Sequence, residues 1–224
     1  MDVVEIIALT MGVAWASGIN LYAAIFMLGW MHTTGNMELP PDLVILSNPL
    51  VLAAAGFMYC VEFFADKVPG VDTGWDAIHS FIRIPAGAML AAGAVGEMSP
   101  EIQLAALIVG GTMATGSHLT KTGSRVMINT SPEPFTNWGA SIAEDAMVIG
   151  GLWTALNHPW LFLLLLVLFI ALIIWLLPKL WRGFKAILRF IGRLLGIAKE
   201  EPPPQAATGE TAFKIDRPTL PPDK

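Results

Sequence analysis

The segment PWLFLLLLVLFIALIIWLLP, residues 159–178, constrains the fold of this chain more than any other feature. It contains no charged residue, and a helix of about 20 such residues crosses the hydrocarbon core of a bilayer. The whole chain is similarly apolar. Its mean hydropathy is +0.61, and only 14% of its 224 residues are charged, against about 25% in soluble domains. The sequence therefore predicts an all-α integral membrane protein.

Further apolar segments predict about six transmembrane helices in total. The others are expected near 5–31, 49–66, 80–96, 102–120 and 138–156. Basic residues are concentrated just after the last span, which places residues 179–199 in the cytoplasm under the positive-inside rule. The connectors at 32–48, 97–101 and 157–158 contain no Lys or Arg and are expected outside. Six spans would then place both termini on the cytoplasmic side of the membrane.

Two of these spans are interrupted by small residues at matching places. In ASGIN and in ATGSH, a helix reaches Gly18 or Gly116 and, two residues later, the polar side chain of Asn20 or His118. Because three spans per half is an odd number, the pattern predicts two inverted three-helix repeats with broken first helices, at about 5–96 and 102–178. Alternatively, the small residues serve only close helix packing.

Three acidic residues, Glu62, Glu144 and Asp145, fall inside predicted spans. A charge at the bilayer centre costs at least about 2.5–3.5 kcal/mol, so each must face protein, water or a partner. They either lock helices together through ion pairs or bind a solute or a proton. With Asn20 and His118, they are the candidate substrate- or ion-binding residues.

Polar residues also form two stripes next to the membrane. Their spacings of three and four residues place the members of each stripe on one helix face. We expect them, with Asp66 and Lys67, to form a cytoplasmic entrance that attracts an anion, or else interhelical ion pairs. The stripes are Asp72, Asp76, His79 and Arg83, and His118, Lys121, Arg125 and Asn129.

The sequence contains no motif of a hydrolase, a nucleotide-binding loop or a clustered set of His and Cys ligands. The single cysteine, Cys60, excludes an intramolecular disulfide. We therefore expect no catalytic residue, no metal, no cofactor and no nucleic-acid partner.

The C-terminal region differs from the transmembrane domain, residues 1–178. Residues 179–199 predict a basic amphipathic helix, whose apolar face would lie on an anionic lipid surface over 181–195. Its apolar positions are Trp181, Phe184, Leu188, Ile191 and Leu195. The Pro-rich residues 200–224 predict a disordered cytoplasmic tail.

Several segments together resemble a family of bacterial membrane proteins, in their residues and in their order. They are ASGINLY, LSNPLVLAAAGFMYCVEFFADKVPGVD, WDAIHSFIRIPAGA, HLTKTGSRVMINTSPEP and SIAEDAMVIGG. The family is catalogued as domain of unknown function 4126, and the resemblance covers about residues 5–180. It implies an integral membrane protein without a known activity. The positions that match the family pattern are Gly18, Asn20, Glu62, Asp66, Lys67, Pro69, Asp72, Arg83, His118, Lys121, Asn129, Glu144 and Asp145.

These observations favour a small secondary transporter or permease of the inner membrane. Glu62 and Glu144 would be its proton-coupling acids, Asp145 would assist them, and the solute would be an anion or a lipid head group. The alternative is a scaffold or envelope-assembly protein in which the charges lock helices together. An intramembrane enzyme ranks third, and the sequence leaves homo-oligomer formation open.

Overall fold

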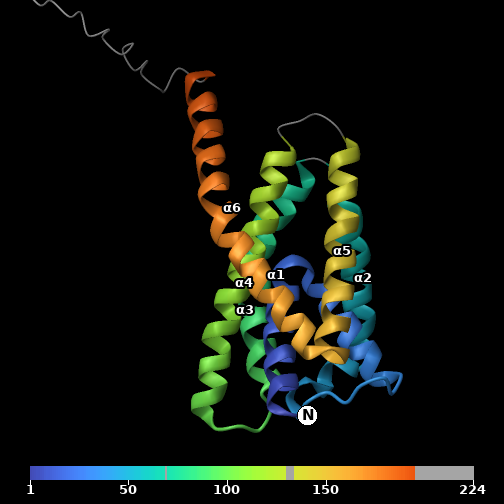
Figure 1. Cartoon of the computed structure of the whole chain (residues 1–224). Helices are drawn as coiled ribbons and strands as arrows, with labels where there is room; N and C mark the ends of the chain where they lie inside the picture. Colours follow the sequence, from blue (N-terminus) through green and yellow to red (C-terminus); the bar gives the residue numbers. More distant parts are fainter. Residues whose placement is uncertain (69, 130–133, 195–224) are drawn as a thin grey trace, which may run out of the picture. The chain divides into compact units, whose positions relative to one another are not determined.

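The computed structural model describes residues 1–68, 70–129 and 134–194, and the described part of the chain is all α (Figure 1). Residues Met1–Ala186 form one compact unit, and Ile187–Lys224 are assigned to a second. Pro69 and the predicted tail at 200–224 lie outside the described residues. The elements are α1 (Val3–Thr33), the 3-10 helix η1 (Pro41–Ser47), α2 (Pro49–Ala65), α3 (Val71–Ala94), α4 (Pro100–Ile128), α5 (Pro134–Asn157) and α6 (Pro159–Leu194).

The described helices have the length and hydropathy of a multi-pass membrane protein. Four of them, α1, α3, α4 and the first part of α6, are long and apolar enough to cross a membrane. The bent pair η1 and α2, with 67° between its two helices, makes a fifth candidate span. The predicted count of six is thus too high by this measure, because α5 is not among the candidates.

Helix α1 is broken in its middle and folds back on itself. Asn20 has a non-helical backbone (φ −144°, ψ 96°), and Figure 1 shows the chain turning there and returning toward the N-terminus. The returning half runs antiparallel to α2, since Gly29 packs on the carbonyl of Leu46 while Phe26 lies against Gly56. The structure thus has a break two residues after Gly18, and the fold-back gives α1 the shape of a re-entrant segment, while its length and hydropathy also fit a span.

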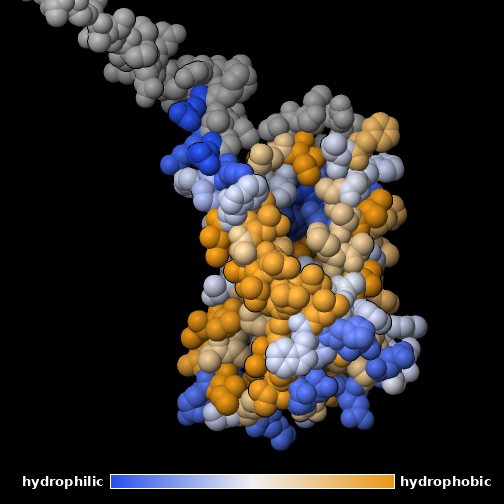
Figure 2. Space-filling model, in the orientation of Figure 1, coloured by the Kyte–Doolittle hydropathy of each residue, from blue (hydrophilic) through white to orange (hydrophobic). Residues whose placement is uncertain are grey.

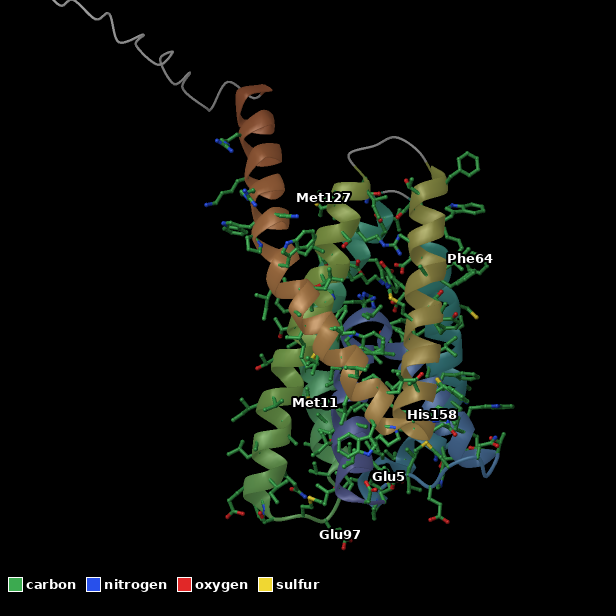
Figure 3. The ribbon with its side chains drawn as sticks, viewed as in Figure 1. Glu5, Met11, Phe64, Glu97, Met127 and His158 are labelled. Carbon is green, nitrogen blue, oxygen red and sulfur yellow. The ribbon has the colours of Figure 1, made fainter. Side chains whose placement is uncertain are left out.

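Because α1 folds back, the loop that follows it lies at the same end of the helical unit as the α3–α4 and α5–α6 turns. Pro40, just after the returning half, lies beside Gly96 in the turn between α3 and α4, 3.6 Å from where a Cβ on Gly96 would stand. Gly12, in the first half, packs on Ala155 close to the turn between α5 and α6. In Figure 3, Glu97 and His158 lie toward this end, and Met127 and Phe64 toward the other.

The expectation that both termini share a side is therefore wrong for the described unit. Helices α2, α3, α4, α5 and the part of α6 up to Ala186 alternate in direction after the fold-back (Figure 1). The N-terminus and residue 186 consequently lie at opposite ends. The sequence argument failed here because it treated residues 5–31 as a complete crossing.

Small residues allow α1, α3 and α4 to cross in direct contact. A Cβ on Gly18 would collide with the Ser117 hydroxyl and the Ala114 carbonyl, and a Cβ on Gly87 would collide with Ser17. Since Ala14 also lies near Gly110 of α4, the first half of α1 and α4 run parallel. The inverted relation predicted for these two segments is therefore wrong. The packing interpretation of the small residues holds at this crossing.

The break predicted at Gly116 is also wrong. Helix α4 continues from Pro100 to Ile128, and a Cβ on Gly116 would meet no atom within 4 Å. The residues that α4 contributes to the crossing are Ala114 and Ser117, on either side of this glycine. The similar segments ASGIN and ATGSH therefore have different structures. In α4 the small residues form a packing surface, and only in α1 does the segment also contain a break.

Helix α6 covers the first half of α1 through aromatic and aliphatic side chains. Trp15 meets the rings of Phe162 and Phe169 edge to face, with centroids 6.2 and 5.8 Å apart. The helix is continuous through Pro178 as far as Leu194, so residues 179–194 extend the last span instead of starting a new helix. The side chains of Phe184, Leu188, Ile191 and Leu195 lie outside the described residues.

The outer surface suits a lipid environment. Figure 2 shows a hydrophobic middle zone on the visible face, with hydrophilic residues gathered at the end that holds the N-terminus. Large apolar side chains are exposed on several helices, among them Phe57, Phe64, Phe81, Leu168 and Ile174. Exposure of this kind is expected of helices that face hydrocarbon.

The fold-back predicts the sidedness of surface labels. In a Cys60→Ser background, a membrane-impermeant maleimide should modify Val3→Cys and Asn36→Cys from one side of sealed vesicles and Val68→Cys from the other. All three positions are exposed. Labelling of Val3→Cys and Asn36→Cys from opposite sides would show that α1 crosses the bilayer completely.

The helix crossing predicts opposite tolerance at two glycines. Gly18→Ala should lower the free energy of unfolding by about 1–3 kcal/mol, because the added methyl group overpacks the contact with Ser117 and Ala114. Gly116→Ala is the matched control and should be neutral or slightly stabilising, since it meets open space and favours helix. Thermal unfolding in detergent measures both; equal losses in the two variants would contradict the crossing.

Candidate functional site

Seven buried charged side chains from four helices form a single ionic network. Six of them are at most 4% exposed, and Glu144 is 9% exposed. Both stripes predicted from the sequence contribute, because α3 and α4 turn those faces toward α2 and α5. The ionic network consists of Glu62, Asp66, Asp76, Arg83, Lys121, Arg125 and Glu144.

Arg83 joins α3 to α2. One of its terminal nitrogens lies 2.6 Å from Glu62 Oε1, and the other lies 2.6 Å from Asp76 Oδ1. Asp76 stands two helical turns before Arg83 on the same helix, so the i, i+7 spacing lets one guanidinium bind both carboxylates. The guanidinium is fully buried and is neutralised by two acids.

Lys121 stands at the centre of the network. Its Nζ lies 2.8 Å from Asp66 Oδ2, 3.3 Å from Glu62 Oε1, 3.5 Å from Asp76 Oδ1 and 3.7 Å from Glu144 Oε2. It also donates to the backbone carbonyl of Ile19 in α1, at 3.2 Å. Glu62 and Glu144, the two predicted coupling acids, therefore share one ammonium group.

Arg125 anchors α5 to the end of α2. It binds Glu144 through two nitrogens, at 3.1 Å from Oε1 and 2.6 Å from Oε2, in the fork geometry that suits a carboxylate. It also donates to the carbonyl of Asp66 and to the carbonyl and side-chain oxygen of Asn137. Asn137 was not predicted, since nothing in FTNWGA distinguishes it from a loop amide.

The break in α1 lies against this network. Gly18 presents its carbonyl to His118 Nδ1 at 3.3 Å, and Ile19 presents its carbonyl to Lys121. Asn20 Oδ1 accepts from the backbone N–H of Ala23 at 2.9 Å, which caps the returning half of the helix. The Asn20 amide donates to Asp145 Oδ1 at 3.0 Å.

His118 lies beside the network and belongs to a set of hydroxyl contacts. Its Nε2 is 2.5 Å from Ser80 Oγ and 3.4 Å from Thr122 Oγ1, and its Nδ1 is 3.5 Å from Arg83. Ser80 was not predicted, although it lies one residue after His79 on α3. His118 thus lies beside the break in α1, next to Gly18, and its role in binding stays a prediction.

The remaining predicted residues have local roles. The amide of Asn129 donates to both carboxylate oxygens of Asp72 at 2.9 Å and ties the end of α4 to the start of α3. His79 stacks on Trp75 and contacts its carbonyl, at 2.9 Å from Nδ1. Lys67 lies over the Phe63 ring and donates to Ser141 Oγ at 3.4 Å.

The predicted stripes do not form an open cytoplasmic entrance. Arg83 and Arg125 are 0% exposed and Lys121 is 4% exposed, and all three are bound to carboxylates. Packing of α3 and α4 around the fold-back in α1 turns the charged faces inward. Helical spacing predicted the faces correctly, but it carries no information on the direction in which they point.

Carboxylates outnumber cations at this place. Four carboxylates and three cations form the network, and Asp145 adds a fifth buried acid, only 8% exposed. Four carboxylate oxygens receive no hydrogen bond from a protein group: Glu62 Oε2, Asp66 Oδ1, Asp76 Oδ2 and Asp145 Oδ2. Within the described residues, no group of three or more His, Cys, Asp or Glu side chains is placed to hold a metal ion.

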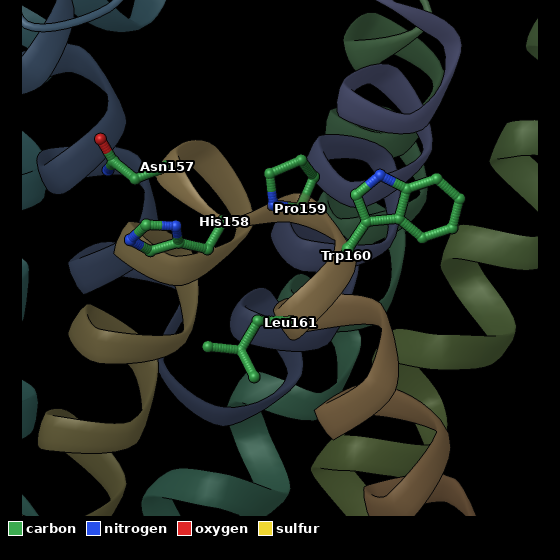
Figure 4. Close-up of a pocket in the computed structure, with 5 residues that line it drawn as sticks. All are labelled: Asn157, His158, Pro159, Trp160 and Leu161. Atoms are coloured by element: carbon green, nitrogen blue, oxygen red, sulfur yellow. The ribbon is translucent and has the colours of Figure 1, made fainter.

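A hollow in the surface lies between α4 and α5. Figure 2 shows hydrophilic side chains at its floor, beneath a largely hydrophobic rim. Glu144 and Asp145 of α5 are the most exposed of the five acids, at 9% and 8%. A second, shallow pocket at the turn between α5 and α6 is lined by Asn157, His158, Pro159, Trp160 and Leu161 (Figure 4) and lies toward the opposite end from Met127.

The chain belongs to the family described as domain of unknown function DUF4126, which matches residues 7–179. The matched region contains the whole ionic network, the break in α1, most of α1, all of α2 to α5 and the apolar part of α6. No curated protein and no solved structure matches the chain.

The pairing within the network predicts a large cost for removing one acid. Glu62→Gln leaves Arg83 and Lys121 short of a buried counter-charge, and we expect the free energy of unfolding to fall by about 3–5 kcal/mol. Glu101→Gln, at an exposed position on α4, is the matched control and should unfold like the wild type. Thermal unfolding in detergent compares them; an unchanged Glu62→Gln variant would contradict the pairing.

Proposed function

We propose that this member of the DUF4126 family is a small secondary transporter whose buried ionic network binds and releases protons. One observation carries the proposal: five buried acids face three buried cations, and one partly exposed cation, Lys67, beside a broken helix. Helix breaks with free backbone groups next to buried charges are typical of substrate and ion sites in transporters. Acids inside a membrane domain likewise mark proton relays and ion pathways. The proposal does not depend on an inverted repeat.

The charge balance favours a proton, together with a neutral or cationic solute, over the anion expected from the sequence. Each of the three buried cations is bound to at least two carboxylates within 4.0 Å. An anion would have to displace one of these acids. A proton or a cation would instead reduce the excess of negative charge.

The hollow between α4 and α5 supplies the route in this proposal (Figure 2). Glu144 and Asp145 lie closest to solvent among the acids, and Glu62 lies behind Lys121. In this arrangement Lys121 passes between carboxylates as they gain and lose protons, because four acids lie within 3.7 Å of its Nζ. Glu62 and Glu144 then exchange protons around the ammonium group that they share, whichever acid first takes up the proton.

A scaffold or envelope-assembly protein is the second candidate. The observation in its favour is that the three buried cations join all the surrounding helices. Arg83, Lys121 and Arg125 bind groups on α1, α2, α3 and α5. Buried pairs of this kind can serve only to fix which helices meet. A scaffold would need no proton exchange in the network.

For location, we propose a bacterial inner membrane with the basic end of α6 in the cytoplasm. Lys179 lies over the Trp175 ring at 3.1 Å and Lys185 lies 5.2 Å from the Trp181 ring. Tryptophan and lysine together are typical of the lipid–water interface, so this end of α6 would anchor at an anionic lipid surface. The fold-back then places the N-terminus outside.

Proton flux tests the proposal directly. The protein is reconstituted into liposomes that contain a pH-sensitive dye, and a potassium diffusion potential drives protons while small neutral and cationic solutes are added in turn. We expect at least one solute to raise proton uptake several-fold over liposomes without protein. Glu144→Gln should abolish the increase and Glu101→Gln should keep it. Uptake equal to that of empty liposomes for every solute would favour the scaffold.

A further inference from the structure

We infer that Asp145 is the carboxyl group that takes up the proton. We also infer that protonation of Asp145 changes the conformation of the break in α1, through the hydrogen bond between Asp145 and Asn20. The inference deepens the proposed function and rests on it. The sequence pointed to Glu62 and Glu144 as the coupling acids and to Asp145 only as a helper. The contacts of the three acids reverse this order.

Asp145 differs from the other buried acids in its partners. Glu62, Asp66, Asp76 and Glu144 each have a Lys or Arg nitrogen within 4.0 Å. Among the described residues, no such nitrogen lies within this distance of Asp145. Its hydrogen-bond partners are neutral groups: the Asn20 amide, which donates at 3.0 Å, and the Tyr59 hydroxyl. A buried carboxylate without a directly paired cation is stabilised more by protonation than one that forms an ion pair.

One oxygen of Asp145 is free to carry that proton. Oδ1 accepts from Asn20, whereas Oδ2 is buried and receives no hydrogen bond from a protein group. Protonation at Oδ2 removes the unpaired charge without breaking an ion pair. Protonation of Glu144, in contrast, would have to weaken its bidentate ion pair with Arg125.

The titratable groups that surround Asp145 are mixed in sign. Their interactions with it identify Tyr59, Glu62 and Asp66 from α2, Lys67 at the end of α2, and Lys121 from α4. The two lysines favour the charged form of Asp145, and the two acids oppose it. The protonation of Asp145 therefore depends on the charges of both the lysines and the acids around it.

Asn20 connects the charge on Asp145 to the backbone of α1. Its Nδ2 donates to Asp145, and its Oδ1 caps the returning half of the helix at Ala23. A hydrogen bond to an ionised carboxylate is about twice as strong as one between neutral groups. Protonation of Asp145 thus weakens the bond that orients Asn20, and with it the cap on the returning half.

Infrared spectroscopy locates the proton without a transport assay. The difference spectrum between neutral and alkaline pH should contain the C=O band of a protonated carboxyl group. We expect this band to be lost in Asp145→Asn, shifted in Asp145→Glu and unchanged in Glu101→Gln. A band that is identical in the wild type and both Asp145 variants, or no band in the wild type, would overturn the assignment.

Hydrogen exchange tests the connection through Asn20 at one fixed pH. Asn20→Ala, which lacks the cap, and Asp145→Asn, which resembles the protonated form, should both raise exchange in residues 20–26 several-fold. Ser141→Ala is the control, because Ser141 lies one turn earlier on the buried face of α5 and contacts Lys67. Wild-type exchange in Asp145→Asn, with faster exchange in Asn20→Ala, would overturn the connection.

The two proposals fail separately. If proton flux is absent while the infrared band follows Asp145, the chain has this proton site without being a transporter. If flux is present and the band ignores Asp145, transport stands and this assignment falls.

Discussion

The arrangement of the helices depends on neutralising three buried cations inside a chain that faces lipid. Arg83, Lys121 and Arg125 lie on α3 and α4, and most of their partners come from α1, α2 and α5. An unpaired charge in hydrocarbon costs several kcal/mol, so these helices are held at the positions where the acids meet the cations. Small residues at the crossing of α1, α3 and α4 allow the backbones to come close enough for this.

The composition of the ionic network also determines whether it can exchange protons. A fully matched set of charges would be inert, but here the acids exceed the bases and several oxygens lack a protein donor. The excess lies at the break in α1, where the helix has exchanged regular backbone bonds for contacts with Lys121, His118 and Asp145. The stability of the fold and the exchange of protons would therefore depend on the same residues. A change in one acid would affect both, which is why matched controls at exposed positions matter.

Much of the site could be predicted from the sequence, but its orientation could not. The spacing of Asp72, Asp76, His79 and Arg83 identified one helix face, and all four are buried as a group. Charges inside apolar spans identified Glu62, Glu144 and Asp145, because such residues have few structural alternatives in lipid. Asn137 and Ser80 escaped prediction since a single amide or hydroxyl carries no periodic signal.

The topology was harder to predict for a related reason. ASGIN and ATGSH are alike in sequence, yet α1 breaks at Asn20 and α4 continues through Gly116. The difference lies in what surrounds them. Asn20 gains Asp145 as a partner and caps the next half-helix, whereas Gly116 faces open space. Local sequence cannot report a partner 125 positions away, and the missed fold-back reverses the direction assigned to the first half of α1.

The re-entrant segment also bears on how the chain is assembled during synthesis. Its apex exposes the carbonyls of Gly18 and Ile19 and the side chain of Asn20, and the groups that satisfy them lie on α4 and α5, about 100 residues or more later in the chain. Until those helices emerge, the apex has no protein partner for its polar groups, and bare hydrocarbon would not accept it. The apex therefore gains its polar partners only after α4 and α5 have been made.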